Sequence, residues 1–138
     1  LGVMTATALN LAVANNVSVD FDQPTTLIYG NNLHGMLSVG SRRVLWAGDA
    51  NHDQSVIANG PDNDPMSVLN AALIAPANTL FNANYLVKGY SPNDLDMDGY
   101  SVFSGPNNDI NLVVGNVLLH QGNTTHSGNY IVNGVLPR

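Results

Sequence analysis

The chain contains the stretch Gly48-Asp49-Ala50-Asn51-His52-Asp53-Gln54-Ser55 and, further along, the related stretch Asn93-Asp94-Leu95-Asp96-Met97-Asp98-Gly99-Tyr100. Both place short, oxygen-bearing side chains at alternate positions, which is the ligand spacing in the first half of many calcium-binding loops. This alternation allows one tight loop to turn three oxygen atoms toward a single point, where a hard cation can bind. The two stretches therefore predict two similar metal sites.

The two stretches belong to a longer internal repeat. Shifting the chain by 45 residues superimposes the loops and also several pairs that follow them: Gly60-Pro61 on Gly105-Pro106, Asn78-Thr79 on Asn123-Thr124, and Asn84-Tyr85 on Asn129-Tyr130. Self-similarity at a fixed period indicates copies of one structural unit. We therefore divide the chain into a β-rich segment at 1–45 and two repeats at 46–90 and 91–135.

The composition limits what the protein can bind. The chain has 138 residues, of which ten are acidic and four are basic. Every acidic residue is Asp, and eight of the ten lie in the repeated loops, at positions 49, 53, 62, 64, 94, 96, 98 and 109. With so few basic residues, we expect no binding to nucleic acid or to an anionic membrane. No apolar run approaches the roughly 20 residues that cross a bilayer, so no membrane insertion is expected.

Cysteine is absent, which excludes disulfides, thiolate metal sites and cysteine nucleophiles. The low Lys content and the abundance of Asn, Gly, Thr and Ser favour an extracellular or cell-surface location. The chain starts at Leu1 without an initiator Met, and we expect it to be a piece of a longer precursor with neighbouring domains.

Residues 1–45 have the character of short strands. Four runs are rich in β-branched or aromatic residues and are bounded by Asn, Gly or Pro: 3–7, 17–21, 26–29 and 43–46. A few short strands rarely make an independent sheet, and open strand edges attract a partner. We expect this segment to complete a sheet begun upstream, to lie against the repeats, or to pair with another copy of the chain.

Each repeat is predicted to form a loop, a helix and a strand. In the first repeat, Asp64 is predicted to cap a helix that starts at Pro65 and stops at Ala75-Pro76. In the second, the helix starts at Asp109 and ends near Gln121-Gly122. Matched strands are expected at 84–87 and 129–132. The predicted fold class is α+β, with the two half-buried helices packed in approximate two-fold symmetry.

The tandem loops, each followed by one apolar helix and preceded by none, resemble dockerin-type repeats, the loop–helix relatives of the EF-hand. The segments Gly60-Pro61-Asp62-Asn63-Asp64 and Gly105-Pro106-Asn107-Asn108-Asp109 depart from that pattern, because they lengthen the loop by about four residues. The longer form, preceded by Leu45-Trp46-Ala47-Gly48-Asp49, is similar to repeats near the ends of large secreted bacterial surface proteins. The resemblance covers residues 45–135.

The resemblance implies two Ca²⁺ sites. The implied ligands of the first are the side chains of Asp49, Asn51, Asp53 and Asp64 with the carbonyl of Ser55. Those of the second are the side chains of Asp94, Asp96, Asp98 and Asp109 with the carbonyl of Tyr100. Because the loops are lengthened, Asp62 competes with Asp64 as the closing ligand, and Asn107 competes with Asp109.

The second site is expected to bind calcium more tightly than the first. It has three carboxylates in its first half against two, and Gly99 stands where the loop needs a sharp turn, whereas the first loop has Gln54 there. The alternative interpretation is that both loops are Asp/Asn-rich surface turns held by their own hydrogen bonds. Calcium is favoured over zinc because all candidate ligands are oxygen atoms, and over magnesium because magnesium demands strict octahedral geometry.

Other chemistry finds little support in the sequence. The four His residues lack the spacing of a zinc or catalytic site, and His52 is expected to point outward. Trp46 is interpreted as a hydrophobic lid beside the first loop, with a sugar-stacking platform as the alternative. The Asp residues lie too close together in the loops to act as a glycosidase pair across a substrate. We therefore expect no enzyme activity.

We expect a non-enzymatic, calcium-stabilised extracellular module that serves as a building block of a surface fibre or adhesin, with other copies of the chain as partners. One alternative is a dockerin-like module that docks onto a receptor domain. Another is calcium-dependent carbohydrate binding.

Overall fold

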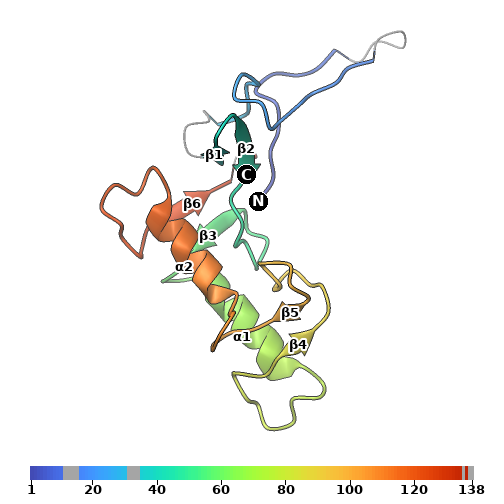
Figure 1. The fold of residues 1–138 in the computed structure, drawn as a ribbon, viewed down its shortest axis with the longest axis vertical. Helices are drawn as coiled ribbons and strands as arrows, with labels where there is room; N and C mark the ends of the chain where they lie inside the picture. The colour runs from blue at the N-terminus through green and yellow to red at the C-terminus, as the bar shows by residue number, and fades with distance from the viewer. Residues whose placement is uncertain (11–15, 31–34, 135, 137–138) are drawn as a thin grey trace.

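The structure is a computed structural model, and it describes residues 1–10, 16–30, 35–134 and 136. In chain order its elements are β1 (Met36–Val39), β2 (Arg42–Leu45), β3 (Ser55–Ile57), α1 (Asp64–Ile74), β4 (Val87–Lys88), β5 (Tyr100–Ser101), α2 (Ile110–Leu119) and β6 (Ile131–Asn133). This confirms the α+β class. Figure 1 shows the N-terminal third with β1 and β2 at one end of the molecule and α1 toward the other. None of the helices described is long and apolar enough to cross a membrane.

The short strands of the two repeats pair with each other rather than within a repeat. β3, which follows the first loop, pairs antiparallel with β6 of the second repeat, and β5 pairs antiparallel with β4 of the first. The registers correspond, because Ser55 faces Asn133 while Tyr100, 45 residues after Ser55, faces Lys88. The observed strands begin two or three residues later than the predicted runs at 84–87 and 129–132.

The helices begin and end close to the predicted positions, but their caps differ. Asn63, not Asp64, caps α1, because its side chain accepts a hydrogen bond from the Met66 amide at 3.1 Å. The Asp64 carboxylate is turned away into the loop, where backbone amides bind it. The predicted end at Ala75-Pro76 is confirmed, since the helix stops at Ile74.

The second helix repeats this arrangement. Asn108 accepts a hydrogen bond from the Asn111 amide at 3.0 Å, and Asp109 makes no capping hydrogen bond of its own. α2 ends at Leu119, shortly before the predicted Gln121-Gly122. An Asn before each helix is therefore the capping residue in both repeats, and the Asp that follows it is free to serve the loop.

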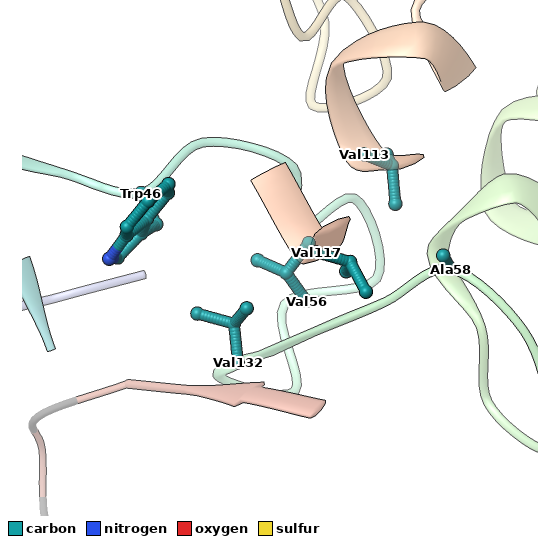
Figure 2. Packing of buried hydrophobic residues seen from close by; sticks show 6 residues of the cluster. All are labelled: Trp46, Val56, Ala58, Val113, Val117 and Val132. Carbon is teal, nitrogen blue, oxygen red and sulfur yellow. The ribbon is translucent and has the colours of Figure 1, made fainter. Parts of the chain in front are cut away.

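The main core joins both repeats (Figure 2). It contains Trp46 together with Val56 and Ala58 of the first repeat and three valines of the second: Val113, Val117 and Val132. Val56 and Val132 face each other across the β3–β6 pair. α1 contacts α2, and its buried residues include Val68 and Ala72. The repeats therefore share one hydrophobic core instead of folding as two separate units.

The N-terminal third contains less strand structure than predicted. The run at 43–46 is confirmed as β2, and its partner β1 was not predicted. The runs at 3–7 and 26–29 meet only in an isolated bridge between Thr5 and Ile28. No strand forms at 17–21. The N-terminal third has a second, smaller core that contains Ile28 and Met36.

Hydrogen bonds from side chains and backbone form a turn at the end of the run 17–21. The Asp22 amide donates to the Asp20 carboxylate at 3.2 Å, and the Thr26 hydroxyl donates to the Asp20 carbonyl at 2.6 Å. The buried guanidinium of Arg43 donates to the Thr26 carbonyl at 2.7 Å. Such local bonds offer the backbone an alternative to a strand ladder, and here they form a turn.

Candidate metal centres

The second loop brings three carboxylates together. Oxygen atoms of Asp94, Asp96 and Asp109 all lie within 4.8 Å of one another. Asp94 is 5% and Asp109 1% exposed, whereas Asp96 is open to solvent. Three carboxylates at this spacing repel each other, and a cation among them would relieve the repulsion. The geometry is therefore that of a possible metal site whose ligands are all oxygen atoms.

Backbone amides hold these carboxylates in place. Asp109 accepts hydrogen bonds from the Leu95 amide at 2.6 Å and from the Val102 amide at 2.7 Å. Asp94 accepts from the Gly99 amide at 3.0 Å and from the Asp98 amide at 3.1 Å. A carboxylate fixed by two amides keeps its remaining lone pairs in a set direction, as a metal ligand must.

Two predicted ligands of the second site lie outside this group of three acids. The exposed Asp98 carboxylate accepts a hydrogen bond from the Tyr100 amide at 2.8 Å. Tyr100 is the first residue of β5, where its backbone faces Lys88 of β4. The structure thus gathers Asp94, Asp96 and Asp109, and it places Asp98 and Tyr100 on the adjoining part of the loop.

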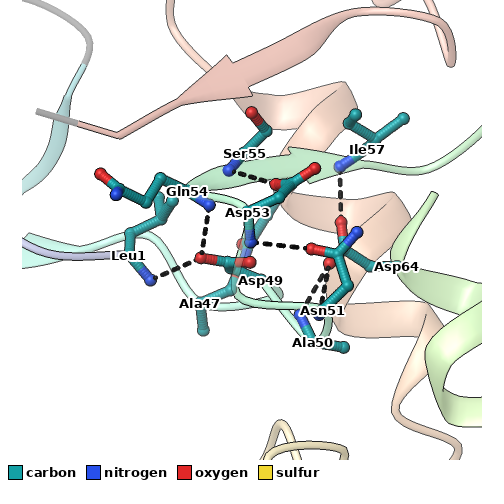
Figure 3. A network of polar contacts seen from close by, with 11 residues as sticks. Leu1, Ala47, Asp49, Ala50, Asn51, Asp53, Gln54, Ser55, Ile57 and Asp64 are labelled. Atoms are coloured by element: carbon teal, nitrogen blue, oxygen red, sulfur yellow. Dashed lines mark hydrogen bonds and ion pairs between the residues drawn. The ribbon is translucent and has the colours of Figure 1, made fainter. Parts of the chain in front are cut away.

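The first loop is built in the same way (Figure 3). Asp64 is fully buried and accepts hydrogen bonds from the Ala50 amide at 2.6 Å and the Ile57 amide at 2.7 Å. Asp49 Oδ2 accepts from the Gln54 amide at 3.2 Å, and the amino group of Leu1 lies 3.3 Å away from the same oxygen. Asp49 Oδ1 is buried and has no hydrogen-bond partner among the described residues. A buried carboxylate oxygen without a partner is costly unless a cation or water binds it.

The rest of the first loop resembles the second loop but carries one negative charge fewer. Asn51 Oδ1 accepts a hydrogen bond from the Asp53 amide at 3.0 Å, and Asp53 accepts from the Ser55 amide at 2.8 Å. Asn51 occupies the position that Asp96 has in the second loop. For this reason the first loop does not hold a group of three clustered acids like the second, among the residues that the structure describes.

The structure distinguishes the competing closing residues. Asp62 and Asn107 are exposed, and each has a left-handed backbone with φ of 56°. Their neighbours Asn63 and Asn108 donate side-chain hydrogen bonds to the carbonyls of Gly60 and Gly105, both at 2.6 Å. These bonds fold the inserted residues outward as a turn. Asp64 and Asp109 are consequently the acids that reach the loop interiors.

Burial is the largest influence on the pKa of Asp64 and of Asp109, the buried acid of each loop. It raises the pKa of Asp64 and of Asp109, while hydrogen bonds from backbone amides act in the opposite direction. The charge of Asp49 also raises the pKa of Asp64, and that of Asp96 raises the pKa of Asp109. Each loop interior therefore disfavours uncompensated negative charge.

The two loops differ in the residue at one turn position, which is Gln54 in the first loop and Gly99 in the second. Gln54 has a φ of 69° and Gly99 a φ of 89°, so both stand in the left-handed region that glycine adopts at little cost. Gln54 is strained there, and its side-chain Oε1 is buried without a hydrogen-bond partner among the residues described. His52 is exposed, as expected, and also has a left-handed backbone.

Trp46 is part of the core and not a platform for sugars. Its side chain is 4% exposed and its ring centroid lies 4.8 Å from that of His120, which in turn lies 5.1 Å from that of Tyr130. The sequence prediction missed this buried histidine. It also missed Asn78 and Asn123, which fold the chain after each helix, although the register of Asn78-Thr79 with Asn123-Thr124 was a usable signal.

Both loops thus contain side-chain oxygen atoms, internal amide hydrogen bonds and a buried acid, and the second loop gathers three carboxylates that could hold a metal ion. No family model, no curated protein and no solved structure matches the chain.

Proposed function

We propose that this chain is a non-enzymatic module whose fold is stabilised by calcium at two loop sites. In the first site, Asp49, Asn51, Asp53 and Asp64 would bind through their side chains and Ser55 through its carbonyl. In the second, Asp94, Asp96, Asp98 and Asp109 would bind through their side chains and Tyr100 through its carbonyl. The observation that carries the proposal is the cluster formed by Asp94, Asp96 and Asp109.

The unpartnered oxygen of Asp49 supports the first site independently of the second. The shared hydrogen-bond pattern of Asp64 and Asp109 supports a common role for both loops. We propose on the same basis that the repeats pack with approximate two-fold symmetry, since the strand pairs between them have corresponding registers. The second site is the tighter one, because Asp96 adds a charge that Asn51 lacks.

Calcium would act by linkage. An ion that binds the folded loops and not the unfolded chain stabilises the fold by RT ln(1 + [Ca²⁺]/Kd). Calcium at about 100 times Kd adds ~2.7 kcal/mol per site, a large share of a small domain's stability. Each loop leads directly into a strand that pairs with the other repeat, so an ion in either loop would stabilise both repeats.

We propose that the module acts outside the cell as a building block of a surface assembly, where millimolar calcium keeps such sites filled. The described sheets have only two strands each and therefore have open edges. The β1–β2 hairpin also exposes apolar side chains, among them Val39 at 56% and Val44 at 45%. These features favour pairing with another copy or with a neighbouring domain of a longer precursor.

Docking onto a separate receptor domain ranks second. The helices offer four polar residues for such a contact, namely Ser67, Asn70, Asn111 and Asn116. The Ser67 hydroxyl contacts the Ala50 carbonyl at 3.2 Å, and the Asn116 amide donates to the Ala47 carbonyl at 2.8 Å. Both side chains thus serve the fold, which leaves few polar groups for a receptor.

Light scattering and electron microscopy of the purified chain, in calcium and after chelation, test assembly directly. We expect oligomers or filaments in calcium that dissociate as the fold loosens on chelation. A chain that stays monomeric at high concentration in saturating calcium would contradict the assembly role and favour the docking alternative.

A further inference from the structure

A pocket of about 340 Å³ lies beside the C-terminal end of α1. Its walls are mainly apolar and come from the helix end at Ala75 and Pro76 and from the segment Tyr85–Lys88. None of its lining residues is a proposed calcium ligand, although Lys88 pairs through its backbone with Tyr100 of the second loop. A volume of this size is sufficient for one large side chain or a small ligand.

The equivalent place in the second repeat is filled. Shifting by 45 residues turns Ala75, Tyr85 and Val87 into His120, Tyr130 and Val132. There Trp46 packs on His120, His120 packs on Tyr130, and Val132 is completely buried in the core. Val87, in contrast, is only partly buried. The position of Ala75 in the pocket is thus held by His120 in the second repeat, where Trp46 and Tyr130 pack on it.

The pocket of the first repeat is open because several positions around it carry smaller residues than the equivalent positions around the filled place of the second repeat. In the 45-residue register Trp46 corresponds to Ser91, which lies beside β5, the strand that pairs with β4 of the first repeat. Ser91 is held by a 2.9 Å hydrogen bond between its hydroxyl and that of Ser101. Three more positions change from a larger to a smaller residue between the filled and the open repeat, namely Val56 to Ser101, Val117 to Ala72 and His120 to Ala75, whereas Ala58 of the core corresponds to the larger Phe103.

A charged side chain, that of Lys88, stands at the edge of the pocket and can select its ligand. Lys88 is one of four basic residues in a chain of net charge −6, and no ion pair joins it to another described residue. It stands at the edge of an otherwise apolar pocket, where an ammonium group attracts a carboxylate. In the second repeat, where His120 stands in place of Ala75, the equivalent residues border the planar ring of Trp46.

We propose that this pocket binds an aromatic side chain, next to an acidic residue, from a partner peptide. The ring takes the place that Trp46 occupies against the second repeat, and the acid pairs with Lys88. The partner is not a second copy presenting its own Trp46, because that side chain is already buried in the core. The site is a recognition surface additional to calcium binding and to strand pairing.

The proposal is tested by NMR titration of the isotope-labelled chain in saturating calcium. The ligand is the blocked peptide Ac-Asp-Trp-Asp-NH2, and the control is Ac-Asp-Ala-Asp-NH2. We expect saturable shifts confined to residues 75–88, with a Kd of about 0.1–1 mM, which is typical of a single anchor. The Ala peptide is expected to cause no saturable shift. Equal responses to both peptides, or no response at 75–88, would overturn the proposal.

Two equally exposed residues provide a matched pair of variants. Leu86 lines the pocket and is 45% exposed, and Ile131, its equivalent in the second repeat, is 46% exposed. Leu86→Ala is expected to raise the Kd of the Trp peptide about fivefold, while Ile131→Ala leaves this Kd unchanged. Lys88→Gln weakens the peptide and removes its salt dependence. A Kd that Leu86→Ala and Ile131→Ala change equally would contradict the site.

Discussion

Asp64 and Asp109, 45 residues apart, make the same pair of hydrogen bonds: each accepts one from the amide 14 positions earlier at 2.6 Å and one from the amide seven positions earlier at 2.7 Å. Both carboxylates are buried, and both tie the start of a loop to the strand that ends it. Each therefore has a structural role in its loop that precedes any binding of metal.

Replacing Asp64 with Ala removes the acceptor for the buried amides of Ala50 and Ile57. We expect the free energy of unfolding to fall by about 3 kcal/mol even without calcium, because unsatisfied buried donors cost about 1–3 kcal/mol each. Urea denaturation measures the change. Asp62→Ala is the matched control, since Asp62 is exposed and two positions away. Similar losses from both variants would contradict the buried role of Asp64.

Exchanging the residues that differ between the loops tests what sets their affinities. Asp96→Asn gives the second loop the charge of the first, and Asn51→Asp does the reverse. We expect Asp96→Asn to weaken the tighter calcium site by about tenfold and Asn51→Asp to strengthen the weaker one, because affinity follows the number of ligand charges. Calorimetric titration of both variants provides the measurement. Unchanged affinities would show that these positions do not bind the ion.

The left-handed turn position gives a second paired test. Gln54→Gly relieves strain at φ of 69° and is expected to stabilise the chain by about 1 kcal/mol. Gly99→Ala introduces strain at φ of 89° and is expected to destabilise it by a similar amount. Thermal melts of both variants in calcium should therefore shift in opposite directions. A stabilised Gly99→Ala variant would refute this assignment of the strain.

The stabilisation by calcium should increase with pH. Burial raises the pKa of Asp64 and Asp109 above the usual value of about 3.8, so without calcium the folded chain holds these protons more tightly than the unfolded chain. In the calcium-free chain, the stability gained from the protonated carboxyls of Asp64 and Asp109 is fully present below their pKa in the unfolded chain. It is lost as the pH rises through their pKa in the folded chain. Calcium requires the ionised carboxylates and compensates this loss. Melts with and without calcium should therefore diverge as the pH rises above 4, and a constant gap would argue against these acids as ligands.

The sequence predicted the elements that depend on local patterns. The repeat, both helices and the stop at Ala75-Pro76 follow from periodicity, proline and loop chemistry. Short strands such as β4 and β5 form only because the other repeat supplies a partner, so their bounds could not be derived locally. The run predicted as a strand at 17–21 instead leads into a turn at 20–26 that side-chain hydrogen bonds hold.

The placement of the candidate ligands was predictable in part for the same reason. Alternation indicated that Asp94 and Asp96 face one point, and the resemblance to dockerin-type repeats implied Asp109 as their partner. Sequence alone left Asp62 as a competitor of Asp64, because the choice depends on which acid the folded loop buries. In the structure Asn63 caps the helix and Asp64 is the acid turned inward.

Both loops are proposed to bind calcium and thereby to stabilise the fold. Calorimetric titration of calcium into the calcium-free chain, combined with thermal melts before and after, measures both effects. We predict binding of two equivalents and a rise of the melting temperature by about 10 °C or more, given ~2.7 kcal/mol per filled site. No heat of binding and an unchanged melting temperature would mean that the two loops are ordinary Asp-rich turns.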